Sequence, residues 1–293
     1  MTTPRALLIV ESEWRYYKRT WWSTVITTWL RPILFLLAMG VGLGTLIDRT
    51  ADQALGGAGY LAFLAPGLMA ASAMQTAITD SSWPVRTGIK WRKHFWAQIS
   101  TPVTPDDILN GLMIWVFIRL VFVSTAFAVV IWAFGAAPLD RGLAAVPAAV
   151  LCGMAFASPM AFLAAWFKED STMIALFRFS LIPLFLFSGA FFPIDRLPDL
   201  LEPLALFSPV WHGVDLCRSI TLGTPLALPL WVEVGYLLAV TVVGWWAAIR
   251  RLRKTLNLFF FCWPDGSRPS PAPPGERAGS SSGTCWSTSA SGW

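Results

Sequence analysis

Long apolar segments dominate this chain and restrict the folds that are open to it. Six can be read, each about 20 residues or longer, which is enough to cross the ~30 Å hydrocarbon layer of a membrane as an α-helix. The predicted spans are 27–47, 59–79, 109–134, 143–166, 173–192 and 229–249. A closed β-barrel is the other structure that can span a membrane, but these segments lack the alternation of a barrel strand. The sequence therefore predicts an all-α membrane protein with six transmembrane helices.

The composition agrees with a membrane protein and excludes several functional classes. Of the 293 residues, 55% are hydrophobic and 13% are charged, whereas about a quarter of the residues in a soluble domain are charged. The four cysteines are scattered without a CxxC spacing, so neither a metal site nor a disulfide framework is predicted. We attribute the net charge of +5 to orientation in the membrane and expect no nucleic-acid partner.

The distribution of lysine and arginine predicts the orientation of the spans. Cytoplasmic loops of membrane proteins are enriched in these cations. With both termini in the cytoplasm, fourteen cations lie inside and four lie outside. The inner set is Arg5, Arg15, Lys18, Arg19, Arg31, Arg86, Lys90, Arg92, Lys93, Lys168, Arg250, Arg251, Arg253 and Lys254, and the outer set is Arg49, Arg141, Arg196 and Arg218. We therefore predict a multi-pass protein of the bacterial plasma (inner) membrane with both termini cytoplasmic.

Three regions outside the spans differ in character. Residues 5–24 are amphipathic, with aromatic residues between cations, which is typical of an N-terminal helix in the membrane interface. This helix is either a plain anchor or a lever that enters the first span at Arg31. Residues 191–225 are too rich in proline for a span and too apolar for a free loop, so we expect short helices on the outer side. Residues 257–293 are rich in Pro, Gly and Ser, which predicts a disordered tail after a membrane domain of residues 1–256.

A basic and aromatic stretch, residues 88–111, interrupts the apolar sequence between the second and third spans. We expect Trp91, Phe95 and Trp96 to share one face of a short amphipathic helix. The following "TPDD" predicts a new helix with Thr104 as its N-cap. The short helix is either an interfacial anchor or a protruding cytoplasmic helix that docks into a groove of another protein. Aromatic residues and arginine are the usual anchors of such interfaces.

Polar residues inside the predicted spans are candidates for lining a pathway or a seam between subunits. Ionisable groups in a membrane are costly and usually functional. The alternative for Arg31, at the cytoplasmic edge of its span, is that its side chain reaches the interface. For the others the alternative is a structural role. The candidates are Arg31, Gln75, Arg119, Arg178 and Phe179.

Catalytic and nucleotide-binding motifs are missing from the sequence. None of the five lysines follows a glycine, so the chain cannot form the phosphate-binding loop in which a Gly-Lys pair holds ATP. Ser208, His212 and Asp215 fall on one helical face, but no nucleophile elbow or further metal ligand accompanies them. Capping and packing of a short outer helix explain them better than catalysis. We expect no catalytic residue, cofactor site or metal site in this chain.

Four stretches of the sequence resemble the ABC-2 type transporter permeases. They are "GYLAFLAPGLMAASAMQTA", "GIKWRKHFWAQISTPVTPDDILNG", "FRFSLIPLFLFSGAFFPIDRLP" and "SPVWHGVDLCRSITLG". The Phe-Pro pair in "SGAFFPIDRLP" is the most specific of these features. The likeness is greatest to the group of nodulation lipo-oligosaccharide exporters and daunorubicin-resistance permeases, and it runs from about residue 11 to residue 256.

The resemblance implies a fold and a set of partners. It implies six spanning helices, an N-terminal interfacial helix, and short outer helices between the fifth and sixth spans. It also implies two permease subunits, identical or different, and separate ABC ATPase subunits that bind the ATP. In that arrangement residues 90–101 are the coupling helix, and its expected contacts with the ATPase are made by Lys90, Trp91, Arg92, Phe95 and Trp96.

The sequence thus favours the transmembrane permease subunit of an ABC exporter and leaves two alternatives open. The apolar and aromatic spans favour an amphipathic, lipid-linked or drug-like cargo over a small ion. The first alternative is an intramembrane enzyme that acts on lipids or lipid-linked sugars. The second is a structural or sensory membrane subunit without transport activity. A gene for a P-loop ATPase beside this one would favour the exporter over both.

Overall fold

The computed structural model describes residues 5–43, 59–167, 169–186, 188–190 and 207–261, and these residues form helices without a strand. The prediction of an all-α fold is confirmed for this part of the chain. The helices are α1 (Arg5–Phe35), η1 (Leu36–Leu43), α3 (Tyr60–Arg86), η3 (Thr87–Trp91), α4 (His94–Ile99), α5 (Pro105–Ala133), α6 (Leu139–Ala144), α7 (Val146–Trp166), α8 (Asp170–Leu176), η4 (Phe177–Leu181), α9 (Ile182–Leu186), α11 (Pro209–Leu222) and α12 (Leu230–Phe261).

Four helices of the described chain are long and apolar enough to cross a membrane. They are Tyr60–Trp91, Pro105–Ala133, Leu139–Trp166 and Leu230–Leu256, and they cover the predicted spans 59–79, 109–134, 143–166 and 229–249 to within one residue at either end. A shorter apolar helix, Thr28–Ala38, lies within the predicted first span. The predicted fifth span, 173–192, begins in α8 and continues through η4 and α9, and its end lies outside the described residues.

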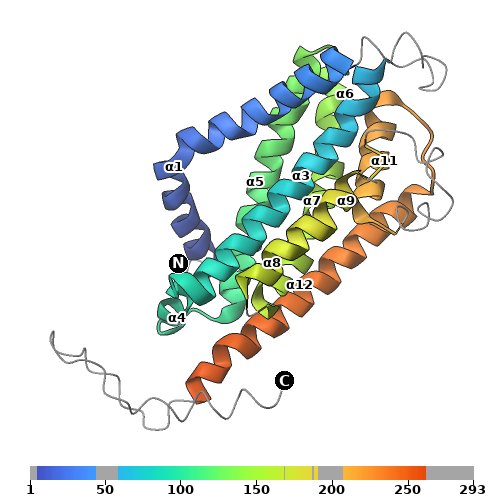
Figure 1. Ribbon diagram of the computed structural model, residues 1–293. Helices are drawn as coiled ribbons and strands as arrows, with labels where there is room; N and C mark the ends of the chain where they lie inside the picture. The colour runs from blue at the N-terminus through green and yellow to red at the C-terminus, as the bar shows by residue number, and fades with distance from the viewer. Residues whose placement is uncertain (1–4, 44–58, 168, 187, 191–206, 262–293) are drawn as a thin grey trace.

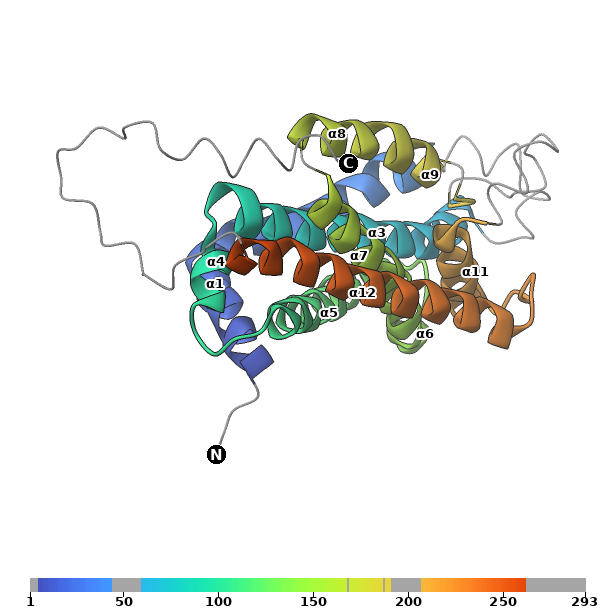
Figure 2. The ribbon, with the colours of Figure 1, turned by 90° about the horizontal axis from the view of Figure 1, so that it is seen from below.

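Small residues allow the long helices to pack closely, as is common in membrane proteins. In α7, Gly153 faces both α5 and α3: a Cβ atom there would lie 2.7 Å from Leu120 and 3.3 Å from the carbonyl oxygen of Ala73. In α12, a Cβ atom on Gly244 would lie 2.7 Å from Ser158 of α7. Figure 2 shows the result, with α3, α7 and α12 in the middle, α5 on one side, and α8 and α9 on the opposite side.

The N-terminal helix α1 is continuous from Arg5 to Phe35 and bends along its length (Figure 1). Its first half begins near α4 and packs on α5, where Ile9 lies against Gly111 and Tyr17 stacks edge-on against Trp115 at 5.6 Å. Its second half runs toward the end of the bundle that contains α6. The predicted interfacial segment and the first part of the predicted first span, 27–35, therefore belong to one helix.

Two predicted boundaries can be compared with the described structure. The N-cap prediction at Thr104 is confirmed: its hydroxyl accepts a hydrogen bond from the Asp107 amide (3.3 Å), and the Asp107 carboxylate accepts one from the Thr104 amide (3.0 Å). This reciprocal pair is a capping box. At the other end of the chain, α12 continues to Phe261, past the expected limit at residue 256, and residues 262–293 lie outside the described part.

Candidate functional site

The basic and aromatic stretch forms a compact unit of η3 and α4, residues 87–99, which we call the island. Its prediction as one helix is wrong, because the chain breaks at Arg92 and Lys93, where Lys93 has a φ of 52°. Trp91 therefore lies in η3, whereas Phe95 and Trp96 lie in α4. The aromatic residues do not share the face of a single helix.

The island's aromatic residues divide into an inner pair and an outer residue. Phe95 is only 4% exposed, and its ring fills the space over Gly88, where a Cβ atom would lie 2.6 Å from it. The Trp96 indole N–H donates to the carbonyl oxygen of Ile89 (2.9 Å). Trp91 is 54% exposed. Phe95 and Trp96 therefore hold the island together, and Trp91 and its neighbouring cations form the outer surface.

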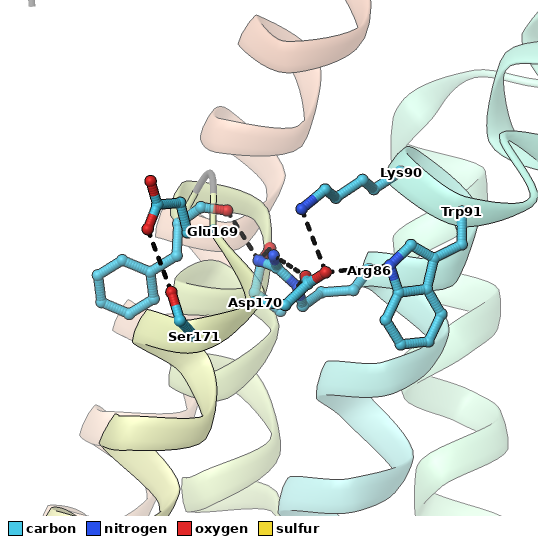
Figure 3. Close-up of polar contacts among 8 residues, drawn as sticks. Arg86, Lys90, Trp91, Glu169, Asp170 and Ser171 are labelled. Carbon is cyan, nitrogen blue, oxygen red and sulfur yellow. Dashed lines mark hydrogen bonds and ion pairs between the residues drawn. The ribbon is translucent and has the colours of Figure 1, made fainter.

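A buried arginine joins three helices beside the island (Figure 3). The side chain of Arg86, at the end of α3, is 2% exposed. Its Nε donates to Oδ1 of Asp170 at the start of α8 (2.8 Å), and its Nη2 bonds to the same oxygen. Its Nη1 donates to the carbonyl oxygen of Phe167 (2.8 Å), just after α7. One guanidinium thus ties together α3, the end of α7 and the start of α8.

The other oxygen of Asp170 faces the island. Oδ2 accepts hydrogen bonds from Lys90 Nζ (3.1 Å) and from the indole N–H of Trp91 (3.2 Å). These donors, and above all the hydrogen bond from Arg86, lower the pKa of the Asp170 carboxyl to about 2. Carboxylates that accept several charged hydrogen bonds are strongly stabilised in the ionised form. Asp170 lies in "KEDS", which the sequence indicated only as a tight turn.

A second group of polar residues surrounds a cavity of about 170 Å³ between α1, α3 and α5. Two of the predicted pathway residues, Gln75 and Arg119, line it together. Arg119 Nε donates to Asp80 Oδ2 (3.0 Å), while Arg119 Nη1 is buried and has no hydrogen-bond partner among the described residues. The remaining lining residues are Thr28, Pro32, Ser72, Thr76, Thr79, Val123 and Phe127. Arg31 immediately precedes Pro32 in α1.

The first half of α1 adds a carboxyl group and an aromatic ring to this cavity cluster. The Tyr17 ring lies 5.2 Å from the guanidinium carbon of Arg119. Burial and, to a lesser degree, the neighbouring Asp80 raise the pKa of Glu13. No sequence pattern singles out Glu13 or Asp80, because their proximity arises only in the folded chain.

The other two predicted pathway residues lie elsewhere. Arg178 and Phe179 belong to η4, and neither lines the cavity. Both are exposed, Phe179 to 81%. Of the five candidates, Gln75 and Arg119 therefore line the cavity, and Arg178 and Phe179 lie on an exposed face of η4, whereas the side chain of Arg31 lies outside the described part.

The possible triad near the start of α11 has structural contacts. Ser208 is the N-cap of α11, and its hydroxyl accepts a hydrogen bond from the Val210 amide (3.3 Å). Asp215 accepts a hydrogen bond from the Ala227 amide (3.0 Å). His212 is buried and packs against the rings of Trp211 and Tyr236. Capping and packing, as the sequence indicated, account for these residues. Among the described residues, no cluster of His, Cys, Asp or Glu is suited to a metal ion.

Comparison with known proteins decides the family. Residues 5–222 match the family described as ABC-2 type transporter, a match that runs from the start of α1 to the end of α11. The chain belongs to the ABC-2 type transporter family. The resemblance indicated by the sequence is thereby confirmed, and the protein is a membrane transport component.

Several bacterial proteins named nodulation protein J are similar to this ABC-2 type transporter chain. The protein from Rhizobium leguminosarum bv. trifolii is 30% identical over 247 residues, which cover 83% of this chain and 92% of the relative. The one from Rhizobium leguminosarum bv. viciae is 28% identical over 240 residues, with 82% and 90% covered. The one from Rhizobium meliloti (strain 1021) is 27% identical, with 82% and 89% covered.

Proposed function

We propose that this chain is the permease subunit of an ABC exporter and that a separate subunit hydrolyses the ATP. The observation that carries this proposal is the family match over residues 5–222. The full sequence has no Gly-Lys pair for a phosphate-binding loop, so a partner must supply the nucleotide site. The cargo is an amphipathic, lipid-linked or drug-like molecule, and it crosses the bacterial plasma membrane between two permease subunits.

The proposed topology places six spans in the membrane and the island in the cytoplasm. Figure 1 supports it, because the first residues of α1, the island and the last residues of α12 lie at one end, and α6 and α11 lie at the other. At the island end, Arg253 of α12 donates through Nε to Asp106 of α5 (2.6 Å). Arg86, Lys90 and Arg253 are all at this end, as expected for a cytoplasmic surface. The predicted outer segment, 191–206, lies outside the described residues.

In the proposed mechanism, the island receives the motion of the ATPase. Lys90, Trp91 and Arg92 form its exposed surface, which combines a large aromatic anchor with cations. Phe95 and Trp96 act indirectly, because their buried contacts hold that surface in shape. When ATP closes the partner, contacts that differ between the two partner states shift the permease toward its outward-open form. Arg178 and Phe179 lie at the seam with the second permease, and the cavity at Gln75 and Arg119 belongs to the pathway.

The experiment that tests this proposal first looks for a P-loop ATPase encoded beside the permease and then produces the two proteins together. We expect the two proteins to co-purify from membranes, and inverted vesicles that contain both to take up a fluorescent amphiphilic amine when ATP is added. The control replaces the phosphate-binding lysine of the ATPase, which should abolish uptake without dissolving the complex. A permease that purifies alone, with uptake that does not depend on ATP, would refute the proposal.

The proposed orientation has its own test with cysteines placed at the two ends of the bundle. Lys93→Cys in the island should react with an impermeant maleimide only after the cells are opened. Arg141→Cys in α6 should react from outside intact cells. The reverse pattern would overturn the orientation and would leave the family assignment intact.

A further inference from the structure

Two separate contacts connect the island to the segment that carries Arg178. The first is Asp170, whose two oxygens are divided between partners: Oδ1 bonds to Arg86, and Oδ2 bonds to Lys90 and Trp91 of the island (Figure 3). A single carboxylate at the start of α8 therefore touches both the buried end of α3 and the exposed surface of the island.

The second contact is a row of three aromatic rings. The Trp91 ring lies 5.6 Å from the Trp83 ring, and Trp83 lies 6.1 Å from the ring of Phe177. Phe177 is the first residue of η4 and directly precedes Arg178. The ring row thus reaches η4 about two helical turns beyond Asp170, and it does so through Trp83, which lies in α3. The island therefore contacts the α8–η4 segment directly at Asp170 and, through Trp83, indirectly at Phe177.

The rest of this segment makes few close backbone contacts with the bundle, and its other attachments are side chains such as Leu176 and Leu184 that pack against the core. In the described part of the chain, α8 and α9 pack mainly against η4, which lies between them in sequence. Met173 is buried, whereas Ile174, Arg178 and Phe179 are exposed. Figure 2 shows α8 and α9 along one side of the bundle, away from α5. A segment with few backbone contacts to the bundle can follow the element that contacts it.

We propose that Asp170 and Phe177 are positioning residues that make α8 and η4 move with the island. This inference rests on the proposed function, in which the ATPase displaces the island. Arg86 is buried and bonded to the end of α7, so it stays fixed while the island moves. The hydrogen bonds to Oδ2 of Asp170 and the ring row transmit the displacement of the island to α8 and η4. Arg178 and Phe179, which the proposed function places at the seam between permeases, are thereby moved by nucleotide binding to the partner.

The geometry of Asp170 suggests a variant that removes its hydrogen bonds to the island and keeps those to Arg86. In Asp170→Asn, the remaining carbonyl oxygen can still accept from Arg86. The new amide NH₂ replaces Oδ2 and cannot accept from Lys90 or Trp91. The matched control is Glu169→Gln, which neutralises the adjacent carboxylate, whose contact in the structure is with Ser171 (3.1 Å). An independent variant, Phe177→Leu, removes the ring row and leaves every Asp170 contact in place.

The test uses the complete complex with its ATPase and a reporter cysteine at the exposed Ile174 in α8. Cys262→Ser and Cys285→Ser remove two native thiols, and Cys152 and Cys217 are buried. The rate of maleimide labelling is measured with and without a non-hydrolysable ATP analogue, together with the rate of ATP hydrolysis. We expect the analogue to change the labelling rate at least threefold in the parent and in Glu169→Gln.

In Asp170→Asn and in Phe177→Leu we expect this nucleotide response to disappear, while ATPase binding and hydrolysis stay within about twofold of the parent. The labelling response to nucleotide requires bound ATPase. ATPase binding and hydrolysis are therefore measured in each variant, to show that the partner interface is intact. A parent complex that hydrolyses ATP without any labelling change would overturn this inference and leave the proposed function standing. A response that persists in both variants would overturn it too. A parent that binds no ATPase would refute the proposed function and the inference together.

Discussion

Two arginines of this ABC-2 type transporter chain, the buried Arg86 and the partly buried Arg119, are held very differently. Arg86 directs its guanidinium to Asp170 and to the carbonyl oxygen of Phe167, so its charge and its donors are used within the protein. Arg119 bonds to Asp80 through Nε only, and its buried Nη1 has no partner among the described residues. Arg86 connects three helices, and Arg119 borders a cavity.

This difference indicates different roles, because buried charges are stable only when they are paired and hydrogen-bonded. The Arg86 site meets that requirement with the groups that the described structure shows, as expected for a mechanical element. The Arg119 site meets it only in part, and its cavity contains room for water or for a polar group of another molecule. On this basis we propose that the Arg86 site serves coupling and that the cavity at Arg119 serves the pathway.

The largest expected effect is a loss of stability when either arginine is replaced by leucine, and we expect a larger loss at Arg86 than at Arg119. Arg86→Leu would leave the Asp170 carboxylate without its main partner and the carbonyl at the end of α7 without a donor. Removing one member of a fully buried pair costs about 3–5 kcal/mol, and the cost here should be somewhat smaller because the Asp170 side chain is 30% exposed. Arg119→Leu should cost less, because Arg119 is only partly buried and its Nη1 already has no hydrogen-bond partner among the described residues. Thermal unfolding of the purified variants in the same detergent measures both. An equal or larger loss for Arg119→Leu would contradict the comparison.

A smaller effect concerns the pH dependence of stability, which has opposite signs at Asp170, beside Arg86, and at Glu13, near the cavity of Arg119. The folded state lowers the pKa of Asp170 to about 2, so its stabilising contribution is present above the ordinary pKa near 4 and is lost only as the pH falls toward 2. The folded state raises the pKa of Glu13, so the contribution of that group is present below its ordinary pKa of 4.5 and is lost as the pH rises through the folded value.

The pH comparison therefore predicts how two amide variants behave at neutral pH. Glu13→Gln should hold or raise the unfolding temperature at pH 7, because it removes a carboxyl that folding disfavours in the ionised form. Asp170→Asn should lower it. Measuring both variants between pH 4.5 and pH 8 checks the signs, and the benefit of Glu13→Gln should shrink toward the acidic end. A drop in stability for Glu13→Gln at pH 7 would show that its carboxylate is well paired.

The smallest expected effect on stability is at Arg178. Because this side chain is exposed, Arg178→Leu should change stability by no more than about 0.5 kcal/mol and should leave membrane insertion normal. If Arg178 lies at a seam between permeases, the variant should nevertheless reduce transport and the yield of the assembled complex. Ile174→Ala, on the same exposed segment, is a matched control. Normal assembly and transport by Arg178→Leu would show that Arg178 does not act at a seam between permeases.

The sequence predicted local features well and distant pairs poorly. The long helices follow from runs of apolar residues, and the capping box at Thr104 follows from four consecutive letters, because both depend on near neighbours. The Arg86–Asp170 pair joins residues 84 positions apart, and a single sequence contains no signal for such a pairing. The break at Lys93 was missed because a lysine with positive φ is uncommon, and the inward direction of Phe95 depends on the space above Gly88.

We propose that the outer surface of the island binds the ATPase, and co-purification is the decisive measurement. Trp91→Ala combined with Arg92→Ala removes an exposed aromatic anchor and a cation, each on the order of 2 kcal/mol in an interface. The control is Lys254→Ala, a cation at the same end of the bundle but in α12. We predict that the double variant reaches the membrane in normal amount, no longer retains the ATPase and no longer stimulates its ATP turnover, while the control retains both. A double variant that keeps the ATPase and its turnover would contradict the account and would leave the island as a membrane anchor.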